Sequence, residues 1–544
     1  MMSRFPPALS FSDTPELRRL FETLASSDKP VTIVCGAGVS LDAGLPNWTD
    51  LVTAMLKEAD TGYLAWLMAD DMDLTRKVST LEALVPDHTS MDDVLRRALY
   101  KGVVGPASPG LLARSIARYA VPRRRKAAGT AIRIATTNFD DLLERAVYAE
   151  SRRKSEALGI KDSALWRSDP TRHILHLHGA IPSDGSQSRI GEIVLSEADF
   201  FRHGDQVRKE LVKILLESHV FFVGISMTDR NIVGSLLSPA VQQKRSHERF
   251  LLVSPDRRPV AGPSGSPLDP EEDREFDRYS RLRTKAIANH LGVTPIFLNS
   301  LAQNSQMFVE LSCARDNYKK YMKPDSDIRY GRRLIPYVNE IHTHVGLRDA
   351  NGQRTWRVGR QRKISETLRL EVERTIKPTL GKMARDIDHD EARGHEFSDL
   401  LLLENFALYL WARRPLDEHN NPEYSLELVG CSAYVHHESW STGVIADISA
   451  ESAFPAGQAV YFGNALMSKM DTGHGQRPVW KTIFACPVNV VVGPAEVTCG
   501  SITLNSTLPI CEDGRSSVLG QLRSNEKKEL ADLLQQIGVD AFPS

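Results

Sequence analysis

The chain has 544 residues, and its 68 Lys and Arg side chains almost balance its 69 Asp and Glu, giving a net charge of −1. This length predicts roughly two to four domains, and a hydrophobic content of 41% is sufficient for well-packed cores. The even balance argues against a surface-wide footprint for nucleic acid or anionic membrane. The N-terminus lacks the apolar core of a signal peptide and no segment approaches a membrane span in length, so we expect a cytoplasmic protein.

The first elements are typical of an α/β domain. Residues 13–27 have the pattern of a helix that begins after Asp13 or Thr14 as its cap. Residues 31–35 (VTIVC) then form the short apolar run expected of a parallel strand that is covered on both faces.

A glycine-rich turn, GAGVSLDAGLPNW, follows this strand. Gly36, Ala37 and Gly38 allow a sharp turn close to a diphosphate, and we expect free N–H groups of the turn to point at the anion. An ordinary dinucleotide fingerprint has glycine or alanine three residues after the second glycine, but here that residue is Leu41 and the next glycine is Gly44. The turn predicts a nucleotide-binding loop of a different kind, with a ligand-free connection as the alternative.

Beyond the turn, helical and strand patterns alternate. Thr49 is expected to cap the first helix of a mostly helical insertion that extends to about residue 128. Strand patterns then recur between helical ones, at residues 131–137, 173–180, 192–196, 219–226, 249–255 and 292–299. The alternation predicts an α/β fold with a Rossmann-like, doubly wound parallel sheet and a helical insertion.

In the second half, residues 256–275 predict an exposed loop rich in Pro, Gly, Ser and charge, and residues 323–327 predict a domain boundary. A long helical region is expected to reach about residue 413, followed by a β-rich end. Its strand patterns lie at residues 424–437, 442–449, 480–492 and 496–510, and its helical patterns at 458–470 and 524–538. We expect a nucleotide-binding domain (residues 1–320), a helical connector (321–413) and an α+β domain (414–544).

Polar residues follow several of these strands. TTNFD (residues 136–140) stands where the strand at 131–137 gives way to a helix, at the carboxyl edge where ligands bind in such folds. Helix capping is the alternative role for Asn138 and Asp140. Further along, VGISMTD (residues 223–229) follows the apolar run HVFF, and RFLLVSP ends in Val253, Ser254 and Pro255.

The segment HLHG (residues 176–179) is a further candidate. On a strand His176 and His178 would share one face by the period of two, whereas His173 would face the other way. An HxH metal site needs a third ligand that the sequence does not nominate, so we expect no metal there.

Together these segments resemble the sirtuin family in content and in order. GAGVSLDAGLP resembles its glycine-serine-glycine-proline arrangement, and TTNFD its glutamine-asparagine-x-aspartate run with Thr137 replacing glutamine. The HG pair resembles the end of the strand that carries the catalytic histidine, and GIS resembles a glycine-x-serine motif. The trailing SMTDRNI is more similar to relatives of the family in bacterial antiphage defence.

The resemblance implies that NAD is bound as a substrate. It implies that Asn138 positions a water or ribose hydroxyl, that Asp140 contacts the nicotinamide carboxamide, and that His178 is the general base, for which a near-neutral pKa is suited. The NAD-binding residues it implies are Gly36, Ala37, Gly38, Ser40, Asp42, Gly44, Pro46, Trp48, Thr137, Gly224, Ser226, Val253 and Ser254.

Two departures separate the chain from the sirtuin deacylases. These enzymes follow the GxP with an aromatic residue and an arginine, whereas this chain has Asn47, Trp48 and Thr49. Trp48 is expected to cover the nicotinamide pocket or to pack under the loop. Deacylases also carry a four-cysteine zinc ribbon, but the six cysteines here form no CxxC pair and none lies between Cys35 and Cys313. We therefore expect neither a metal nor a peptide-substrate groove.

The C-terminal part is similar in its order of elements to a GAF-type sensor domain. That resemblance implies a pocket for a small molecule such as a cyclic nucleotide, or a role in dimerisation, so we expect a homo-oligomer. Arg123–Lys126 is the densest basic run and is expected to be a solvated loop, so a nucleic-acid partner is not expected.

The leading hypothesis is an NAD+ glycohydrolase effector that releases nicotinamide and ADP-ribose. Because unregulated NAD hydrolysis would injure the cell, we expect activity to depend on a signal received by the C-terminal part during phage infection, as in abortive infection. One alternative is an NAD-dependent protein deacylase or ADP-ribosyltransferase. The other is a non-catalytic module that senses NAD or ADP-ribose.

Overall fold

The computed structural model divides the chain into two compact units, Ser12–Lys323 and Pro324–Ser544, each with its own sheet. It describes the whole chain except residues 1–13, 60–61, 70, 87–88, 101–108, 122–131, 184, 186–188, 244–245, 255–269, 299–301, 324–345, 349–353, 357, 391–395, 415–424, 433–443, 450–451, 470–479, 493–494, 511–516 and 543–544. The basic run Arg123–Lys126, most of the expected loop at 256–275 and most of the expected boundary at 323–327 lie outside the described residues. Among the helices of the described part, none is both long and apolar enough to cross a membrane.

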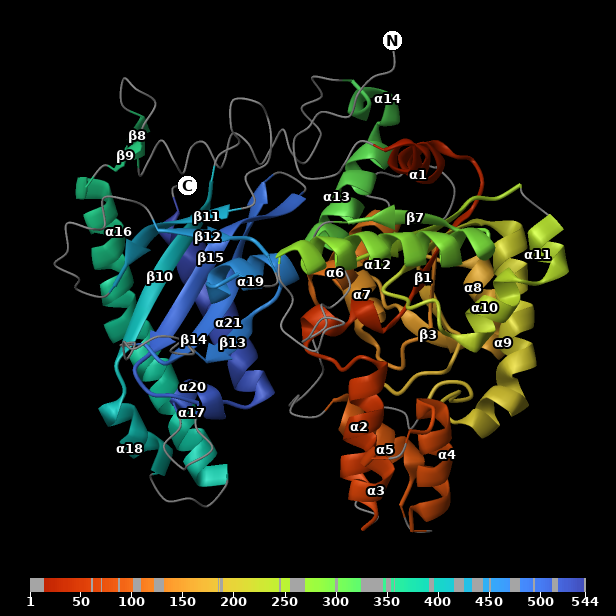
Figure 1. The fold of residues 1–544 in the computed structure, drawn as a ribbon, viewed down its shortest axis with the longest axis horizontal. Helices are drawn as coiled ribbons and strands as arrows, with labels where there is room; N and C mark the ends of the chain where they lie inside the picture. The colour runs from red at the N-terminus through yellow and green to blue at the C-terminus, as the bar shows by residue number, and fades with distance from the viewer. Residues whose placement is uncertain are drawn as a thin grey trace. The chain divides into compact units, whose positions relative to one another are not determined.

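The first unit is built on a seven-stranded, wholly parallel sheet, which confirms the predicted class of sheet (Figure 1). Its strands are β1 (Val31–Cys35), β2 (Ile132–Thr136), β3 (Glu156–Gly159), β4 (His173–His176), β5 (His219–Val223), β6 (Arg249–Val253) and β7 (Thr294–Phe297). In the order β3-β4-β2-β1-β5-β6-β7, strands β2, β4 and β3 lie on one side of β1, with β3 at the edge, and β5, β6 and β7 follow in chain order on the other side. Such a reversal of strand order is where open α/β sheets bind ligands, outside the carboxyl ends of the strands.

Helices cover this sheet in two groups (Figure 1). The first group contains α1 (Pro15–Ser26), α6 (Leu111–Ala120), α7 (Leu142–Ser151) and α13 (Ala302–Asp316). The second contains α8 (Ser163–Ser168), α9 (Glu197–Glu217), α10 (Arg230–Leu236) and α11 (Pro239–Gln243). Two more helices, α12 (Pro270–His290) and α14 (Tyr318–Tyr321), complete the unit. Thr14 caps α1 as predicted, because its hydroxyl accepts from the N–H of Leu17 (3.2 Å).

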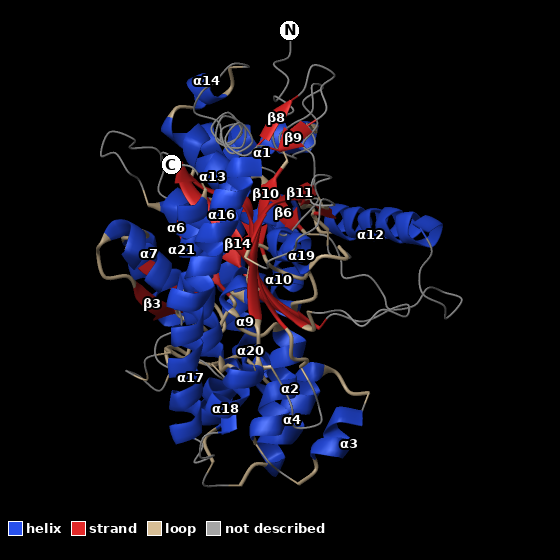
Figure 2. Cartoon of the chain, turned by 90° about the vertical axis from the view of Figure 1, so that its left-hand side faces the viewer, coloured by secondary structure: helices blue, strands red, loops and turns tan. Residues whose placement is uncertain are grey.

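The predicted helical insertion is present as a group of helices at one end of the parallel sheet (Figures 1 and 2). These are α2 (Trp48–Glu58), α3 (Leu64–Ala69), α4 (Leu74–Leu84) and α5 (Met91–Leu99). Their shared core also contains Phe139 and Ile181, from the loops after β2 and β4. The Tyr100 hydroxyl donates to the carbonyl of Ile181 (2.8 Å). The insertion therefore fixes loops at the carboxyl edge of the sheet.

The start of α2 differs from the prediction. Its N-cap is Asn47, whose side-chain oxygen accepts from the N–H of Asp50 (3.0 Å). Thr49 already lies within the helix. Asparagine and threonine both cap helices well, so composition alone did not separate the two positions.

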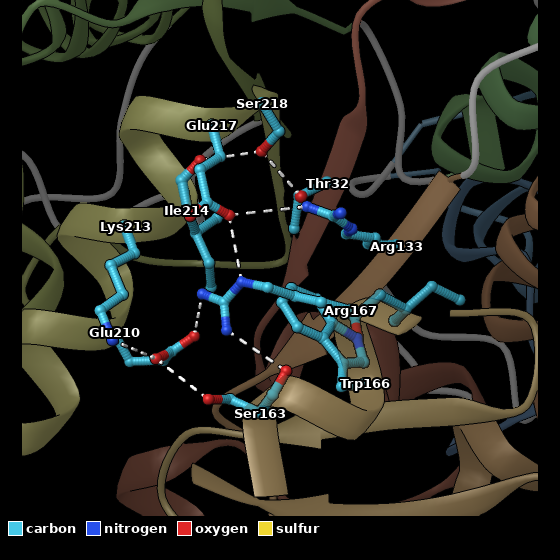
Figure 3. Close-up of polar contacts among 11 residues, drawn as sticks. Thr32, Arg133, Ser163, Trp166, Arg167, Glu210, Lys213, Ile214, Glu217 and Ser218 are labelled. Atoms are coloured by element: carbon cyan, nitrogen blue, oxygen red, sulfur yellow. Dashed lines mark hydrogen bonds and ion pairs between the residues drawn. The ribbon is translucent and has the colours of Figure 1, made fainter. Parts of the chain in front are cut away.

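A polar cluster at the opposite, amino edge joins helices to the sheet (Figure 3). Arg167 of α8 forms ion pairs with Glu210 and Glu217 of α9. The guanidinium groups of Arg133 and Arg167 lie over the Trp166 ring, at 5.7 and 5.5 Å from its centroid. These contacts fix α8 and α9 against the first residues of the strands.

The second unit contains a six-stranded antiparallel sheet in the order β12-β11-β10-β15-β14-β13. The strands are β10 (Phe406–Arg413), β11 (Ser425–Cys431), β12 (Ile445–Asp447), β13 (Leu466–Lys469), β14 (Thr482–Val492) and β15 (Ala495–Ser506). The helices are α16 (Val358–Glu371), α17 (Lys377–Asp390), α18 (Glu396–Leu403), α19 (Pro455–Phe462), α20 (Val518–Gln521) and α21 (Ser524–Ala541), with a π-helical segment (Val372–Ile376) between α16 and α17. A short hairpin of β8 (Gly346–Arg348) and β9 (Arg354–Trp356) precedes them.

Helices pack closely on this antiparallel sheet. Ala456 and Val460 of α19 belong to one hydrophobic core with Trp411 and Leu426 of the sheet. α16 contacts β11, and α21 contacts β14 and β15. The unit is therefore α+β, as predicted for the C-terminal part.

Three predicted elements differ from the observed ones, and one observed strand was not predicted. Residues 406–413, expected to be helical, form β10, since a buried apolar run such as FALYLWAR has no periodicity that separates strand from helix. The helix predicted at 458–470 ends at Phe462, because Gly463 has a φ of 71° and turns the chain into β13. Residues 192–196 form no strand, and β3 had not been predicted.

Candidate active site

Four of the sequence motifs meet at the carboxyl edge of the parallel sheet. The register pairs Cys35 of β1 with Thr136 of β2 and with Val223 of β5, and pairs Thr136 with His176 of β4. The residues that follow these strands are therefore neighbours in space, although 188 positions separate Cys35 from Val223 in the chain. The fold brings the glycine turn, TTNFD, HLHG and VGISMTD together.

The glycine turn packs directly against the backbone after β5. An added Cβ at Gly36 would lie 2.5 Å from the Gly224 carbonyl oxygen, and one at Gly38 would lie 2.7 Å from Gly224 Cα. Gly224 itself has a φ of 66°, which disfavours any other residue. All three glycines are required by this close approach.

This packing corrects one expectation about the turn. The N–H groups of Gly36 and Gly38 donate to the carbonyls of Val223 (2.9 Å) and Gly224 (3.0 Å). They do not point at an open anion site, so the prediction of free amides is wrong at these two residues. Their hydrogen bonds join the ends of β1 and β5 instead.

A buried hydrogen-bond chain connects the β1 and β2 loops. Nδ2 of Asn138 donates to Ser40 Oγ (3.0 Å), and the Ser40 hydroxyl donates to Oδ2 of Asp140 (2.8 Å). All three side chains are at most 5% exposed. Oδ1 of Asn138 is buried and has no hydrogen-bond partner within the described part of the chain. An unpartnered buried amide oxygen is costly, so this atom is a ready acceptor for a water or hydroxyl.

Asp140 begins a helix, which is the role that was considered as the alternative to contact with nicotinamide. Its Oδ1 accepts from the N–H of Leu142, the first residue of α7 (3.1 Å), while Oδ2 faces Ser40. Burial raises the pKa of Asp140 to about 6, although both hydrogen bonds lower it. The carboxyl group thus takes up a proton at mildly acidic pH.

His178 lies just beyond β4, in a turn, and is 5% exposed. Its Nε2 lies 3.5 Å from Oδ2 of Asp229 and 3.5 Å from the amide nitrogen of Asn231. The Phe200 ring of α9 contacts the imidazole edge-on, with centroids 5.6 Å apart. Burial lowers the pKa of His178 while Asp229 raises it, and the net pKa is below the ordinary value. His178 is therefore neutral, as a general base must be.

His176 faces a different set of groups from His178. Its Nδ1 lies 2.9 Å from the carbonyl oxygen of Asn138, and its Nε2 lies 2.8 Å from Oε1 of Glu144 on α7. Burial lowers the pKa of His176, but Glu144, the Asn138 carbonyl and Asp140 together raise it, so the net pKa is above the ordinary value. The His176–Glu144 pair supports the turn that carries Asn138.

No group of three or more His, Cys, Asp or Glu side chains is arranged to hold a metal ion within the described ranges. His176 and His178, which share one face in the sequence-based prediction, turn to separate partners because the strand ends at His176. The basis of the HxH hypothesis is thereby removed.

The remaining candidate residues lie after β1, β2 and β5 and at the end of β6. Thr137 donates its N–H to the Cys35 carbonyl (3.0 Å), and Ser226 is exposed, with its hydroxyl 2.8 Å from that of Thr228. Val253 ends β6, and Ser254 forms hydrogen bonds with Asn304 of α13 (3.0 Å). The other positions belong to the turn after β1, namely Ala37, Asp42, Gly44 and Pro46.

Trp48 is the first residue of α2 and packs against the core of the helical insertion. Of the two roles expected for Trp48, packing under the loop is the one that this contact supports. The contact also joins the end of the glycine turn to the helices that hold the β2 and β4 loops.

Sequence reasoning did not nominate Glu144, Asp229 or Asn231. Asp229 and Asn231 were visible as polar residues in SMTDRNI after a strand, so their position was a usable signal. Glu144 was not, because a glutamate inside a helix is ordinary and only the fold places it against His176.

Comparison with known proteins gives one family match. Residues 132–284 match the family model of the SIR2-like domain. The match supports the presence of a sirtuin-like domain in the first unit. The matched segment contains TTNFD, HLHG and VGISMTD, whereas the glycine turn after β1 precedes it.

Two solved structures are similar to the chain at low identity. A SIR2 homologue in complex with NAD is 16% identical, covers 52% of this chain and 98% of its own, and has a TM-score of 0.26. Sir2Tm bound to a propionylated peptide is 13% identical, covers 49% and 98%, and has a TM-score of 0.23. No curated protein matches the sequence.

Proposed function

We propose that the sirtuin-like domain is an NAD+ glycohydrolase, with NAD+ as its substrate and no metal. The family match indicates an NAD-dependent, sirtuin-type activity. The observation that carries the proposal is the buried Asn138–Ser40–Asp140 chain, which leaves Oδ1 of Asn138 as an acceptor at the carboxyl edge that also holds His178. This combination suits a reaction in which a bound water is the nucleophile.

The proposed reaction breaks the N-glycosidic bond between nicotinamide and ribose. The bonding electron pair leaves with the nicotinamide nitrogen, which becomes neutral, and positive charge develops on the ribose carbon and ring oxygen. Asn138 holds the attacking water, whose oxygen bonds to that carbon, and His178 takes the proton that the water loses. The products are nicotinamide, ADP-ribose and one proton.

The sequence departures favour water over acetyl-lysine as the acceptor. The chain has Trp48 and Thr49 where deacylases have an aromatic residue and arginine, and it has no CxxC pair for a zinc ribbon. A deacylase would produce acetyl-ADP-ribose and an ADP-ribosyltransferase a modified protein, whereas a sensing module would bind NAD or ADP-ribose without consuming it.

We further propose that the C-terminal part regulates this activity as a GAF-like sensor or dimerisation domain, for a cyclic nucleotide or a protein activator. In the chain, α19 separates β10, β11 and β12 from β13, β14 and β15, and these two sets of strands form the two halves of the sheet. A separate sheet offers a place for a signal to act, and the order of its elements supports the resemblance stated for the sequence. The setting we propose is conditional NAD depletion in antiphage defence by a cytoplasmic homo-oligomer.

The test is NAD consumption by the purified full-length chain. Incubation with NAD+ under activating conditions, with cyclic nucleotides as candidate activators, should release nicotinamide and ADP-ribose, which chromatography detects. His178→Ala and Asn138→Ala should strongly reduce the release. Full activity in either variant would refute the assignment. In cells, NAD loss that depends on both the protein and phage infection is the expected result for a defence effector, and unchanged NAD would contradict that role.

A further inference from the structure

The two carboxylate oxygens of Asp229 make different contacts. Oδ1 caps α10 and accepts from the N–H groups of Asn231 (2.8 Å) and Ile232 (3.0 Å). Oδ2 lies 3.5 Å from Nε2 of His178. A capping role needs one oxygen only, so the orientation of the second one toward a buried imidazole requires a separate explanation.

Asn231 holds the ring from a second direction. The side chain of Asn231 is fully buried, with its amide nitrogen 3.5 Å from the same Nε2. Its Oδ1 faces Gly204 of α9 and has no hydrogen-bond partner among the residues described. A Cβ at Gly204 would lie 3.1 Å from that oxygen, so glycine there leaves just enough room for the amide.

Among the described residues, one charged group acts on His178. The elements packed against it contribute the Phe200 ring from α9 and the Asn231 amide from α10, and among the described residues Asp229 is the charged group that acts on it. A carboxylate beside a buried imidazole favours the protonated ring, whereas burial disfavours it. Asp229 is therefore placed to stabilise the charge that His178 acquires as a base.

We propose that Asp229 is a positioning residue for His178: its Oδ2 orients the imidazole and stabilises the imidazolium formed when the ring takes up the proton of the attacking water. Asn231, seated against Gly204, keeps the ring from turning away. This inference rests on the proposed glycohydrolase function. Asp229 itself touches neither substrate nor water in this scheme and gains or loses no proton.

Asp229→Asn is the informative change, because asparagine caps helices as well as aspartate does. It replaces the carboxylate by a neutral amide, so both the charge and the acceptor at Oδ2 are lost. We expect kcat for nicotinamide release to fall by roughly 10- to 100-fold with little change in KM. Asp229 raises the pKa of His178, so its removal lowers that pKa and moves the acidic limb of the kcat/KM profile to lower pH. A loss of activity without this movement would assign Asp229 a structural role only.

The matched control is Asp73→Asn, which changes the carboxylate that caps α4 through the N–H of Thr75 (2.9 Å). Asp73 is 58% exposed and makes no contact with His178 in the described structure, so this variant should keep the wild-type rate and pH profile. A second pair of variants tests Asn231. Gly204→Ala and Gly234→Ala both favour helix, but the first presses on Asn231 and the second meets only the flexible Arg208 side chain (3.2 Å). Only Gly204→Ala should lower kcat.

A titration that needs no turnover separates this inference from the proposed function. NMR of full-length protein with isotope-labelled histidine, with His178→Gln to assign the signal, gives the pKa of His178 in wild type and Asp229→Asn. A lower pKa in the variant supports the inference, and an unchanged pKa overturns it. If wild type does not consume NAD+ under any activating condition, the glycohydrolase proposal fails, while the titration still decides whether Asp229 controls the pKa of His178.

Discussion

The two edges of the parallel sheet differ in the buried polar atoms that have no hydrogen-bond partner among the described residues. These include a guanidinium nitrogen, Nε of Arg133, at the amino edge and amide oxygens at the carboxyl edge. At the amino edge, Arg167 is paired with Glu210 and Glu217 and stacked on Trp166 (Figure 3). At the carboxyl edge, buried oxygens of Asn138 and Asn231 have no partner within the described residues. Paired polar groups stabilise a fold, whereas unpartnered ones cost stability and are retained where a ligand or a reaction needs them. Changes at the amino edge should therefore affect stability, and changes at the carboxyl edge should affect activity.

The largest effect is expected from the two buried histidines, one at each edge. His178→Ala should reduce nicotinamide release by about 100- to 1,000-fold and change thermal stability little, because a general base is lost. His219→Ala is the matched change at the amino edge, where Nδ1 of His219 accepts from the N–H of Glu248 (2.9 Å). It should lower thermal stability and leave kcat unchanged. Equal losses of activity in the two variants would remove the distinction between the edges.

The next largest effect should follow from Arg167→Ala at the amino edge. The change leaves the Glu210 carboxylate, which is 3% exposed, without its main cationic partner, and should cost about 2–3 kcal/mol after a discount for the 20% exposure of Arg167. Arg202→Ala, which removes an exposed partner of Asp199 on the same helix, should cost well under about 1 kcal/mol. Urea unfolding measures both. Similar costs would show that burial does not govern the contribution of this pair.

Asp140→Asn should make the carboxyl edge more stable and less active. The folded-state pKa of Asp140 is raised from 3.8 to about 6, so the folded protein loses stability as the pH rises through this range and the buried carboxyl ionises. Asparagine avoids that loss, and the variant should be more stable than wild type by about 2–3 kcal/mol above pH 7. The advantage should vanish below about pH 4, where the aspartate is protonated in both states. Thermal unfolding across this range tests it, and a pH-independent difference would contradict the burial argument.

The smallest effect is expected for Thr32→Val at the amino edge. The buried hydroxyls of Thr32 and Ser218 lie 2.8 Å apart, and Ser218 also donates to the carbonyl of Ile214 (2.8 Å). Because Ser218 keeps this second bond, the variant should lose only about 1 kcal/mol of unfolding free energy. A loss above about 3 kcal/mol in urea unfolding would mean that the hydroxyl pair does more than the contacts indicate.

The sequence was sufficient to predict a parallel sheet, although not its strand β3, because apolar runs and helical patterns alternate along it. Polar residues that follow the strands at one edge also indicated where a site could lie. The sequence was insufficient for β10, where FALYLWAR is apolar throughout and contains no periodicity. The roles of the glycines were predicted in part. Tight turns need glycines, but only the fold shows that Gly36 and Gly38 pack against Gly224. It also shows that their N–H groups donate to the carbonyls of Val223 and Gly224.

Within the candidate site, Asn138, Asp140 and His178 could be nominated because they occur in short segments after strands. The Ser40 bridge between Asn138 and Asp140 depends on two loops about 100 residues apart, and no local pattern encodes such a contact. The same is true of Glu144 behind His176. Partners contributed by separate elements are a property of the fold.

Asp140 and Asp229 share a feature: each begins a helix with one carboxylate oxygen and turns the other toward the site. Any ligand that hydrogen-bonds to the second oxygen, or alters its contacts, changes the free energy of opening of the first helical turn. The rate of hydrogen exchange at the amides of Leu142, Asn231 and Ile232 should therefore change when the site is occupied. These amides donate to the capping oxygens and do not contact the site themselves. The helix starts of α7 and α10 thus provide built-in reporters of occupancy that do not depend on turnover.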